Sequence, residues 1–257
     1  MAGETARWPS HARWWLRRLV IVGLSFALVL LAAAAALMLV TPSVSNATAL
    51  ARAQARERHE PFPGPVVPVR FATALISTED HRFSSEPGVD PFAIGRVLLA
   101  GLTATGDQGG ATLYQQLAKL LYTTGRTGFG AEAEQVALAV KLKFSYSTQQ
   151  ILRLYAEVAY FGHGFYGLAE ASCGYFGRQA DQLSWPQAAL LAGLVQAPSA
   201  YDPLDHPVLA RSRQQHVIAR LVATGALTAR QAATALAVPL DRLLAGAGQG
   251  CRDSGRN

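Results

Sequence analysis

The sequence predicts an all-α protein with one membrane-spanning helix near its N-terminus, on three observations. Residues 19–40 form an apolar run without a single charge. From residue 67 onward, apolar residues recur at the three- and four-residue spacing of helices, and no convincing run alternates as a strand does. Half of the 257 residues are hydrophobic and only 16% are charged. This is apolar for a soluble protein and agrees with a membrane segment.

The run at 19–40 is long enough to cross a hydrocarbon core of ~30 Å as a helix. Arginines and interfacial tryptophans precede it: Arg13, Trp14, Trp15, Arg17 and Arg18. Because basic flanks stay in the cytoplasm, residues 1–18 are predicted to be a cytoplasmic tail and the rest of the chain to lie outside. The alternative is a cleaved signal peptide, although apolar regions of signal peptides are usually only about 7–15 residues long.

The net charge of +6 suits anionic lipid headgroups, a phosphorylated substrate or nucleic acid. An exported domain does not meet nucleic acid, so that partner is excluded. The two cysteines allow one disulfide at most, but Cys173 lies in a helical stretch typical of a small buried thiol and Cys251 lies in a polar, glycine-rich tail. No bridge is predicted, and no Cys/His spacing indicates a zinc site.

After the anchor, the sequence divides into a juxtamembrane linker (41–66), a helical domain (67–237) and a C-terminal tail (238–257) that we expect to be disordered after about Leu244. A proline-rich spacer, residues 61–68, enters the domain. Caps and apolar spacing predict its helices: Val69–Thr78, Pro91–Leu102, Thr112–Leu121, Ala131–Phe144, Ser147–Phe161, Gly167–Phe176, Ser184–Leu194, Pro207–Thr224 and Thr228–Leu236.

The stretch "ISTEDHRF" places Glu79 and Asp80 at the end of an apolar helix. There the helix macrodipole opposes a negative charge, and partial desolvation would raise the pKa of the carboxyl group further. Such a group suits a general base working near neutral pH. Phe83 is expected to anchor the following turn, and His81 to face solvent. The alternative is an ordinary solvated acidic turn.

A second stretch, "GDQGGATLYQQLAKLLY", begins a helix after two glycines. Thr112, Gln115, Gln116 and Lys119 share one face of that helix at spacings of three and four residues. A hydroxyl, two amides and an ammonium at a glycine-rich helix start suit sugar hydroxyls and phosphate oxygens. The alternative is a plain amphipathic helix.

In this order behind an anchor, the stretches resemble the peptidoglycan glycosyltransferases, lysozyme-like enzymes that polymerise lipid II. "EDHRFSSEPG" matches the first family motif, E-D-x-x-F-x-x-H-x-G, and "GGATLYQQLAKL" matches the second, G-G-S-T-x-T-Q-Q-L-x-K-N. "ILRLYAEVAYFGHGFYGLAEASCGYFG" and "LSWPQAALLAGLVQAPSAYDP" resemble the helical core of the family. The resemblance covers about Val69 to Gly225 in collinear order.

The chain departs from the family at several motif positions. Residues of another type stand at four positions of the first two motifs: Glu86, Ala111, Tyr114 and Leu120. In the third motif, R-K-x-x-E, Ala131 and Glu132 stand where the family has its basic pair. Gln135 stands at the position of the motif glutamate, and Lys143 stands at the position of a later family glutamate. Glu134 is one position away, so we expect a shifted register, with Arg126 supplying the missing positive charge.

The resemblance implies an inverting transfer with Glu79 as base, and Glu134 or Gln135 at the second catalytic position. The residues matched to substrate binding or placed near it are Asp80, Phe83, Thr112, Gln115, Gln116, Lys119, Arg126 and Lys141. Asp80 is expected to orient the turn rather than to react. The implied cofactor is at most Mg²⁺ held through the substrate pyrophosphate, with no metal bound by a protein motif. The implied partners are lipid II, the growing glycan strand, the bacterial inner membrane and other cell-wall synthesis proteins.

Three further expectations follow. No Ser-x-x-Lys or Lys-Thr-Gly motif of a transpeptidase is present in the sequence, so a monofunctional polymerase is expected. Two rival functions stay open: a catalytically impaired homologue that binds lipid II or a partner, and a lytic enzyme that cuts glycan. The base must also be accessible, because a Glu79 carboxylate sealed away or locked to an arginine would contradict the mechanism.

Overall fold

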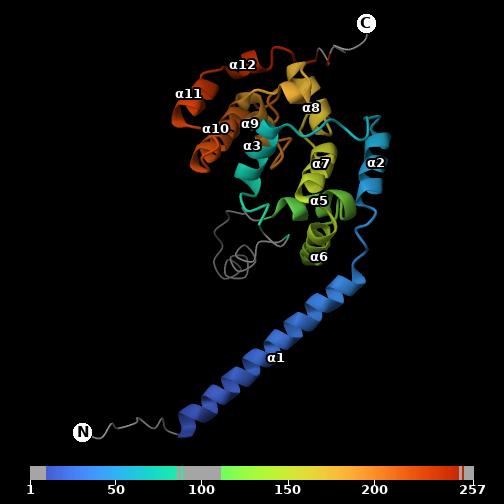
Figure 1. The fold of residues 1–257 in the computed structure, drawn as a ribbon, viewed down its shortest axis with the longest axis vertical. Helices are drawn as coiled ribbons and strands as arrows, with labels where there is room; N and C mark the ends of the chain where they lie inside the picture. The colour runs from blue at the N-terminus through green and yellow to red at the C-terminus, as the bar shows by residue number, and fades with distance from the viewer. Residues whose placement is uncertain (1–9, 86–87, 89–110, 249–250, 252–257) are drawn as a thin grey trace, which may run out of the picture. The chain divides into compact units, whose positions relative to one another are not determined.

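The computed structural model describes residues 10–85, 88, 111–248 and 251 (Figure 1). The chain divides into two compact units at Pro42 and Ser43. The first contains helix α1 (Ser10–Val40), whose segment Arg17–Val40 is long and apolar enough to cross a membrane, with a mean hydropathy of 2.7. This confirms the predicted apolar N-terminal helix and fits a membrane-anchored protein.

The second unit is helical, as predicted. Its elements are α2 (Ala47–Glu57), α3 (Val69–Glu79), α5 (Leu113–Tyr122), α6 (Phe129–Ser145), α7 (Thr148–Val158), α8 (Leu168–Phe176), the 3-10 turn η1 (Ala180–Gln182), α9 (Trp185–Leu194), α10 (Pro207–Ala223), α11 (Ala229–Leu236) and α12 (Leu240–Leu243). Within the described ranges, the one β-type pairing is an isolated bridge between Tyr160 and Tyr166. The predicted helix Pro91–Leu102 lies outside the described residues.

Local capping explains why several helices begin where the sequence predicts. Thr112, Ser147, Ser184 and Thr228 each form a capping box with a glutamine three residues later. In each box the hydroxyl and the glutamine side chain satisfy backbone N–H groups that have no partner within the helix. These starts are encoded within four residues, so the sequence alone specifies them.

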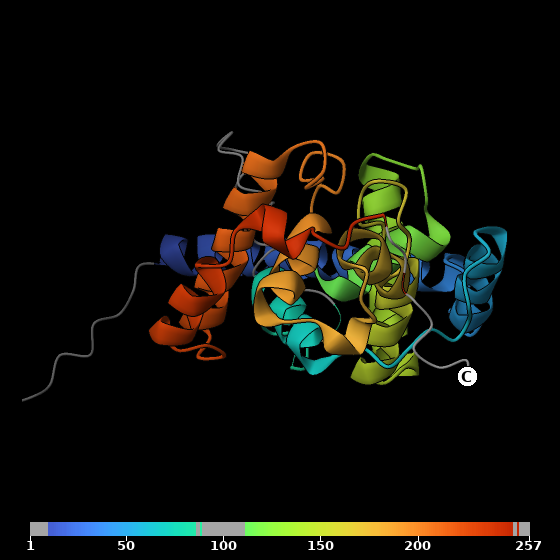
Figure 2. The same ribbon diagram turned by 90° about the horizontal axis from the view of Figure 1, so that it is seen from above.

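Helix α9 forms the centre of the domain. Every residue from Pro186 to Leu194 is buried, as expected for a helix that is apolar on all sides. Helices α3 and α10 pack on α9 and on each other, whereas α5 packs on α6 and α7. Figures 1 and 2 show these two groups side by side within the second unit. The C-terminal end of α3 lies where the groups meet, because Glu79 contacts both α5 and α10.

The predicted linker at 41–66 contains a helix, α2, that packs on the domain. Helix α2 buries Ala47, Ala51 and Ala55 and packs on α7 and α5. These alanines recur every four residues and form a narrow apolar stripe. One charged residue, Arg52, lies between them, and the charged residues from 56 to 60 that follow gave the segment a polar composition.

The C-terminal segment also differs from the prediction. Leu243 of α12 is buried, the backbone N–H of Gly248 donates to the carbonyl of Gly174 (3.1 Å), and Cys251 forms a disulfide with Cys173. The sequence did not predict this bridge and left the pairing of the two cysteines open. They are 78 residues apart in sequence, and only the packing of the tail against α8 brings them together.

Candidate active site

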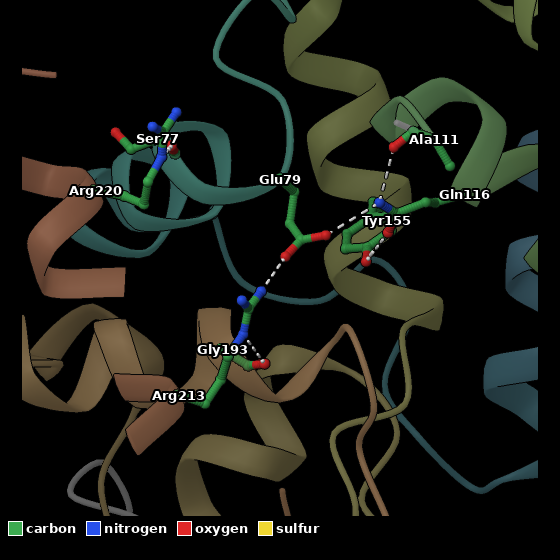
Figure 3. A network of polar contacts seen from close by, with 8 residues as sticks. All are labelled: Ser77, Glu79, Ala111, Gln116, Tyr155, Gly193, Arg213 and Arg220. Carbon is green, nitrogen blue, oxygen red and sulfur yellow. Dashed lines mark hydrogen bonds and ion pairs between the residues drawn. The ribbon is translucent and has the colours of Figure 1, made fainter. Parts of the chain in front are cut away.

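Glu79 ends α3 and its side chain is 11% exposed (Figure 3). The helix buries Phe71, Ala74 and Leu75 against the core, which fixes the direction of its last turn. Glu79 therefore extends from a rigid element toward α5 and α10.

Both oxygens of the Glu79 carboxylate have partners. Oε1 lies 2.7 Å from Nη2 of Arg213 on α10, and Oε2 accepts a hydrogen bond from Nε2 of Gln116 on α5 (3.3 Å). The expectation of a base that is not paired with an arginine is therefore contradicted in this conformation. The sequence contained no signal for Arg213, because it lies 134 residues away.

Gln116 is held in one orientation by a buried tyrosine. Oη of Tyr155 donates to Oε1 of Gln116 (2.8 Å), and Nε2 of Gln116 also donates to the carbonyl of Ala111 (3.2 Å). Because Tyr155 occupies the amide oxygen, the amide NH₂ group must face Glu79. Tyr155, on α7, is 2% exposed and was also missed by the sequence analysis.

The side chain of Arg213 has contacts of its own besides the one to Glu79. Its Nε donates to the carbonyl of Gly193 (3.2 Å), its Cζ lies 5.9 Å from the centroid of the Tyr201 ring, and its side chain is 11% exposed. The guanidinium is thus positioned by α9 and by the segment between α9 and α10.

Burial raises the pKa of Glu79 above its ordinary value. The charge of Arg213 and the hydrogen bonds from Gln116 and Arg213 lower this pKa in part, and the nearby charge of Asp80 raises it. Burial, with the charge of Glu79, also raises the pKa of Tyr155, which keeps its phenol protonated as a donor. A carboxyl group with a raised pKa suits proton transfer near neutral pH.

The turn after α3 is built as the sequence predicts. Asp80 is buried, and its Oδ2 accepts a hydrogen bond from the backbone N–H of Leu113 (2.9 Å), so Asp80 orients the start of α5. Phe83 is fully buried with its ring centroid 4.9 Å from that of Tyr114. His81 is exposed, as expected.

The predicted polar face of α5 is divided between two roles. Thr112 and Gln115 are engaged in the capping box, and Oγ1 of Thr112 also donates to the carbonyl of Gly88 (2.8 Å). Thr112 is buried at 3% exposure. The structure uses both residues to start the helix, and the substrate-binding role predicted for them stays a prediction. Gln116 contacts Glu79, and Lys119 is exposed on the same helix.

The region of the third motif lies on α6 and the loop before it. Glu134 pairs with Arg126 (2.7 Å), with side-chain exposures of 19% and 56%. Nε2 of Gln135 donates to Oγ1 of Thr123 (2.9 Å). The structure thus joins the two residues of the shifted register, Glu134 and Arg126, and directs Gln135 to the end of α5.

Two lysines on α6 take different places. Nζ of Lys143 donates to the carbonyl of Ser84 (3.3 Å) and to Oη of Tyr114 (3.1 Å), so it supports the turn after α3. Lys141 is partly exposed. Lys143 therefore stands at a family glutamate position and makes a structural contact to the turn that follows Glu79.

In the described part of the chain, the ligand atoms of His163, Asp202 and Asp205 lie within 4.8 Å of one another and could hold a metal ion. Asp202 is already engaged: its Oδ1 accepts from the backbone N–H of Leu204 (3.0 Å), and its Oδ2 lies 3.3 Å from Nδ1 of His163. No spacing in the sequence indicated this group, because its members come from two separate loops.

Comparison with known proteins places these features in a family. The family model described as Transglycosylase matches residues 46–222. Penicillin-binding protein 1A of Streptococcus pneumoniae is 36% identical over 68% of this chain and 25% of its own length. Penicillin-binding protein 1F of Bacillus subtilis is 34% identical over 66% of this chain and 24% of its own length. The chain therefore spans about a quarter of the length of these relatives.

A shorter relative matches over most of its length. A Cupriavidus necator protein, named provisionally as a transglycosylase, is 33% identical over 68% of this chain and 75% of its own length. Among solved structures, penicillin-binding protein 1A of Haemophilus influenzae aligns with 70% of this chain and 18% of its own length, at 20% identity and a TM-score of 0.42. The family model covers well over half of the chain, and the chain therefore belongs to the transglycosylase family.

Proposed function

We propose that this protein polymerises lipid II into β-1,4-linked glycan strands of peptidoglycan. The C4 hydroxyl of the acceptor sugar attacks C1 of the donor, whose bond to the pyrophosphate oxygen breaks. The leaving undecaprenyl pyrophosphate takes the bonding electrons, and the hydroxyl proton passes to Glu79. The displacement inverts the configuration at C1 in one step.

One observation carries this proposal: a carboxyl group with a pKa raised by burial is held at a helix end by a fixed hydrogen-bond donor. Glu79 has these properties, with Gln116 on one oxygen. A positioned general base contributes about 10²–10⁴-fold to a rate. Membership in the transglycosylase family supports the same chemistry.

The pair with Arg213 must open before Glu79 can accept a proton from substrate. Arginine binds phosphate oxygens with two parallel hydrogen bonds, so the pyrophosphate of an arriving substrate can compete with Glu79 for Arg213. Loss of that contact removes a charge that lowers the pKa of Glu79. The base would thus become stronger when substrate is present.

Lys119, Arg126 and Lys141 are the other cations that we assign to the pyrophosphate. Lys119 is exposed on α5 and Arg126 is 56% exposed before α6. Mg²⁺, when bound through the substrate phosphates, would neutralise part of the leaving-group charge. The carboxylate next to Glu79, that of Asp80, is buried and bound to Leu113, so the metal would depend on the substrate for its ligands.

We assign α1 to a single crossing of the bacterial inner membrane, with the N-terminus inside and the second unit outside. The arginines before the apolar run support this orientation. The disulfide between Cys173 and Cys251 supports it independently, because structural disulfides persist in oxidising compartments outside the cytoplasm. An anchored enzyme meets a lipid-linked substrate at a high effective concentration.

The test is polymerisation of fluorescently labelled lipid II by the full chain in detergent, with products resolved by size. Wild type should form long glycan strands, and Glu79→Gln should reduce the rate at least about 100-fold. Polymer formed equally by Glu79→Gln would remove Glu79 from the mechanism.

A second candidate function is a membrane-anchored homologue that binds lipid II or a partner without chemistry. The ion pair between Glu79 and Arg213 favours it, as do Gln135 and Lys143 at family glutamate positions. It predicts that wild type binds lipid II and forms no polymer. The same assay, with lipid II binding measured in parallel, separates the two functions.

A further inference from the structure

The C-terminal segment, here residues 244–248 and Cys251, is attached to α8 at two successive residues of that helix. The backbone N–H of Gly248 donates to the carbonyl of Gly174 (3.1 Å), and Cys251 is bonded to Cys173. Figure 1 shows the chain running from α12 toward α8. The segment therefore joins the end of the domain to a helix that lies far from it in the sequence.

The backbone of this segment also fits closely against the end of α8. A Cβ atom added at Gly246 would collide with the carbonyl oxygen of Phe176 and lie 3.0 Å from the backbone nitrogen of Gly177. A Cβ atom added at Gly177 would in turn lie 2.9 Å from the carbonyl oxygen of Gly246. Only glycine at position 246 permits this approach of the two backbones. The fit places Cys251 near Cys173 without help from the sulfur atoms.

Little else holds the segment in place. Leu243 of α12 is buried, but none of the described residues after it is, and no helix is present in the described residues beyond α12. A segment with few buried side chains opens locally at a low free-energy cost. The disulfide is therefore the contact that decides whether the segment stays on α8.

The same bond closes a long loop. Its two cysteines are 78 residues apart, and α9, α10 and α11 lie between them. A cross-link stabilises a domain mainly by restricting the unfolded chain, and the effect grows with the length of the closed loop. Loss of the bond should therefore destabilise the C-terminal half of the domain and not only its last residues.

We propose that the Cys173–Cys251 bond is a redox latch, by which we mean that oxidation of the two thiols fastens the C-terminal segment to α8 and reduction releases it. The reaction is exchange with a disulfide donor. One cysteine thiolate attacks the donor disulfide, and the second cysteine then displaces the donor sulfur from the mixed disulfide. The donor leaves as two thiols, which take the two protons of the cysteines.

This chemistry requires a partner of one class, a thiol oxidase in the compartment outside the cytoplasm, where structural disulfides form and persist. Neither cysteine is a fully buried residue, and local opening of the segment gives a partner access to the sulfurs without unfolding of the domain. The latch does not depend on the glycosyl transfer proposed for Glu79.

The first experiment measures the redox equilibrium of the full chain in an uncharged detergent. The protein is equilibrated in mixtures of reduced and oxidised glutathione, its thiols are labelled with a maleimide, and the labels are counted by intact mass. Wild type should carry no label in excess oxidised glutathione and two labels after full reduction. Two labels on wild type in excess oxidised glutathione would overturn the proposal.

A matched pair of glycine variants tests whether docking of the segment drives the bond. Gly246→Ala should shift the equilibrium constant at least about tenfold toward the thiols, because it lowers the effective concentration of Cys251 at Cys173. Gly130→Ala is the control, since a Cβ atom there meets nothing within 4 Å, and it should titrate as wild type does. Equal equilibrium constants in the two variants would refute the latch.

Release of the segment is measured by unfolding and by proteolysis. Reduction of wild type should lower the Tm by roughly 5–15 °C and speed trypsin cleavage after the exposed Arg242 at least about tenfold. Cys251→Ser should match reduced wild type and should not respond to reductant. If reduced wild type carries two labels but keeps its Tm and its cleavage rate, the bond fastens nothing and the proposal is wrong.

Discussion

Nη2 of Arg213 on α10 lies 2.7 Å from Oε1 of Glu79 at the end of α3, and each side chain is 11% exposed. The pair joins the C-terminal part of the domain to the acid that begins the first family motif. In this conformation the proposed base is neutralised by a neighbour of opposite charge. In the proposed mechanism, activity depends on the opening of this contact.

Removal of Arg213 should change the pH dependence of the reaction. Arg213 lowers the pKa of Glu79, so Arg213→Ala should raise this pKa further. The base acts only when deprotonated, so activity rises as pH rises through the pKa. In the variant, the acidic limb of kcat/KM for lipid II should move to higher pH.

The matched control for that variant is Arg220→Ala. Arg220 also lies on α10, but its Nε donates to the carbonyl of Ser77 rather than to Glu79 (3.2 Å). The acidic limb of the kcat/KM profile of Arg220→Ala should coincide with that of wild type. A profile that stays fixed in Arg213→Ala would mean that Glu79 is not the titrating base.

Tyr155 is expected to be a positioning residue that acts through Gln116. In Tyr155→Phe the amide of Gln116 loses the donor that fixes its orientation, so its NH₂ group no longer always faces Glu79. We expect kcat to fall about tenfold with little change in KM, and stability to fall by about 0.5–1.5 kcal/mol, as for a single lost hydrogen bond.

Tyr175→Phe tests whether that effect is merely structural. Tyr175 is also buried and donates one hydrogen bond, to the carbonyl of Phe161 (3.0 Å). Its loss should lower the Tm by a similar amount and leave kcat unchanged. Equal kcat values in the two variants would remove the positioning role of Tyr155.

The shifted register on α6 predicts a ranking of two variants. Glu134 retains a carboxylate that pairs with Arg126, whereas Gln135 binds Thr123. Glu134→Gln should therefore reduce turnover at least about tenfold, and Gln135→Glu should have the smaller effect. The opposite ranking, measured in the lipid II assay, would restore the family register.

Lys119→Ala should weaken donor binding, because it removes an exposed ammonium on α5 that we assign to the substrate pyrophosphate. We expect KM for lipid II to rise roughly tenfold, equivalent to about 1.4 kcal/mol, with a smaller change in kcat. Initial rates over a range of lipid II concentrations provide the measurement. Unchanged kinetics would show that this part of α5 is only solvated surface.

The sequence by itself determined most of the described helices and the position of Glu79 at the end of one of them. Capping boxes such as Thr112 with Gln115, and apolar residues three or four positions apart, act within a single turn or two. Their consequences do not depend on distant parts of the chain. The same local pattern did not identify α2 as part of the domain. Its stripe of alanines is small, and it is buried only because α7 packs against it.

Only the tertiary structure decided which groups Glu79 meets. Its partner Arg213 is 134 residues away in the sequence, and the two cysteines of the Cys173–Cys251 disulfide are 78 residues apart. Such pairs exist because α3 and α10 pack on the buried helix α9 and because the tail returns to α8. Burial, which raises the pKa of Glu79, is likewise a property of packed helices and not of any one segment.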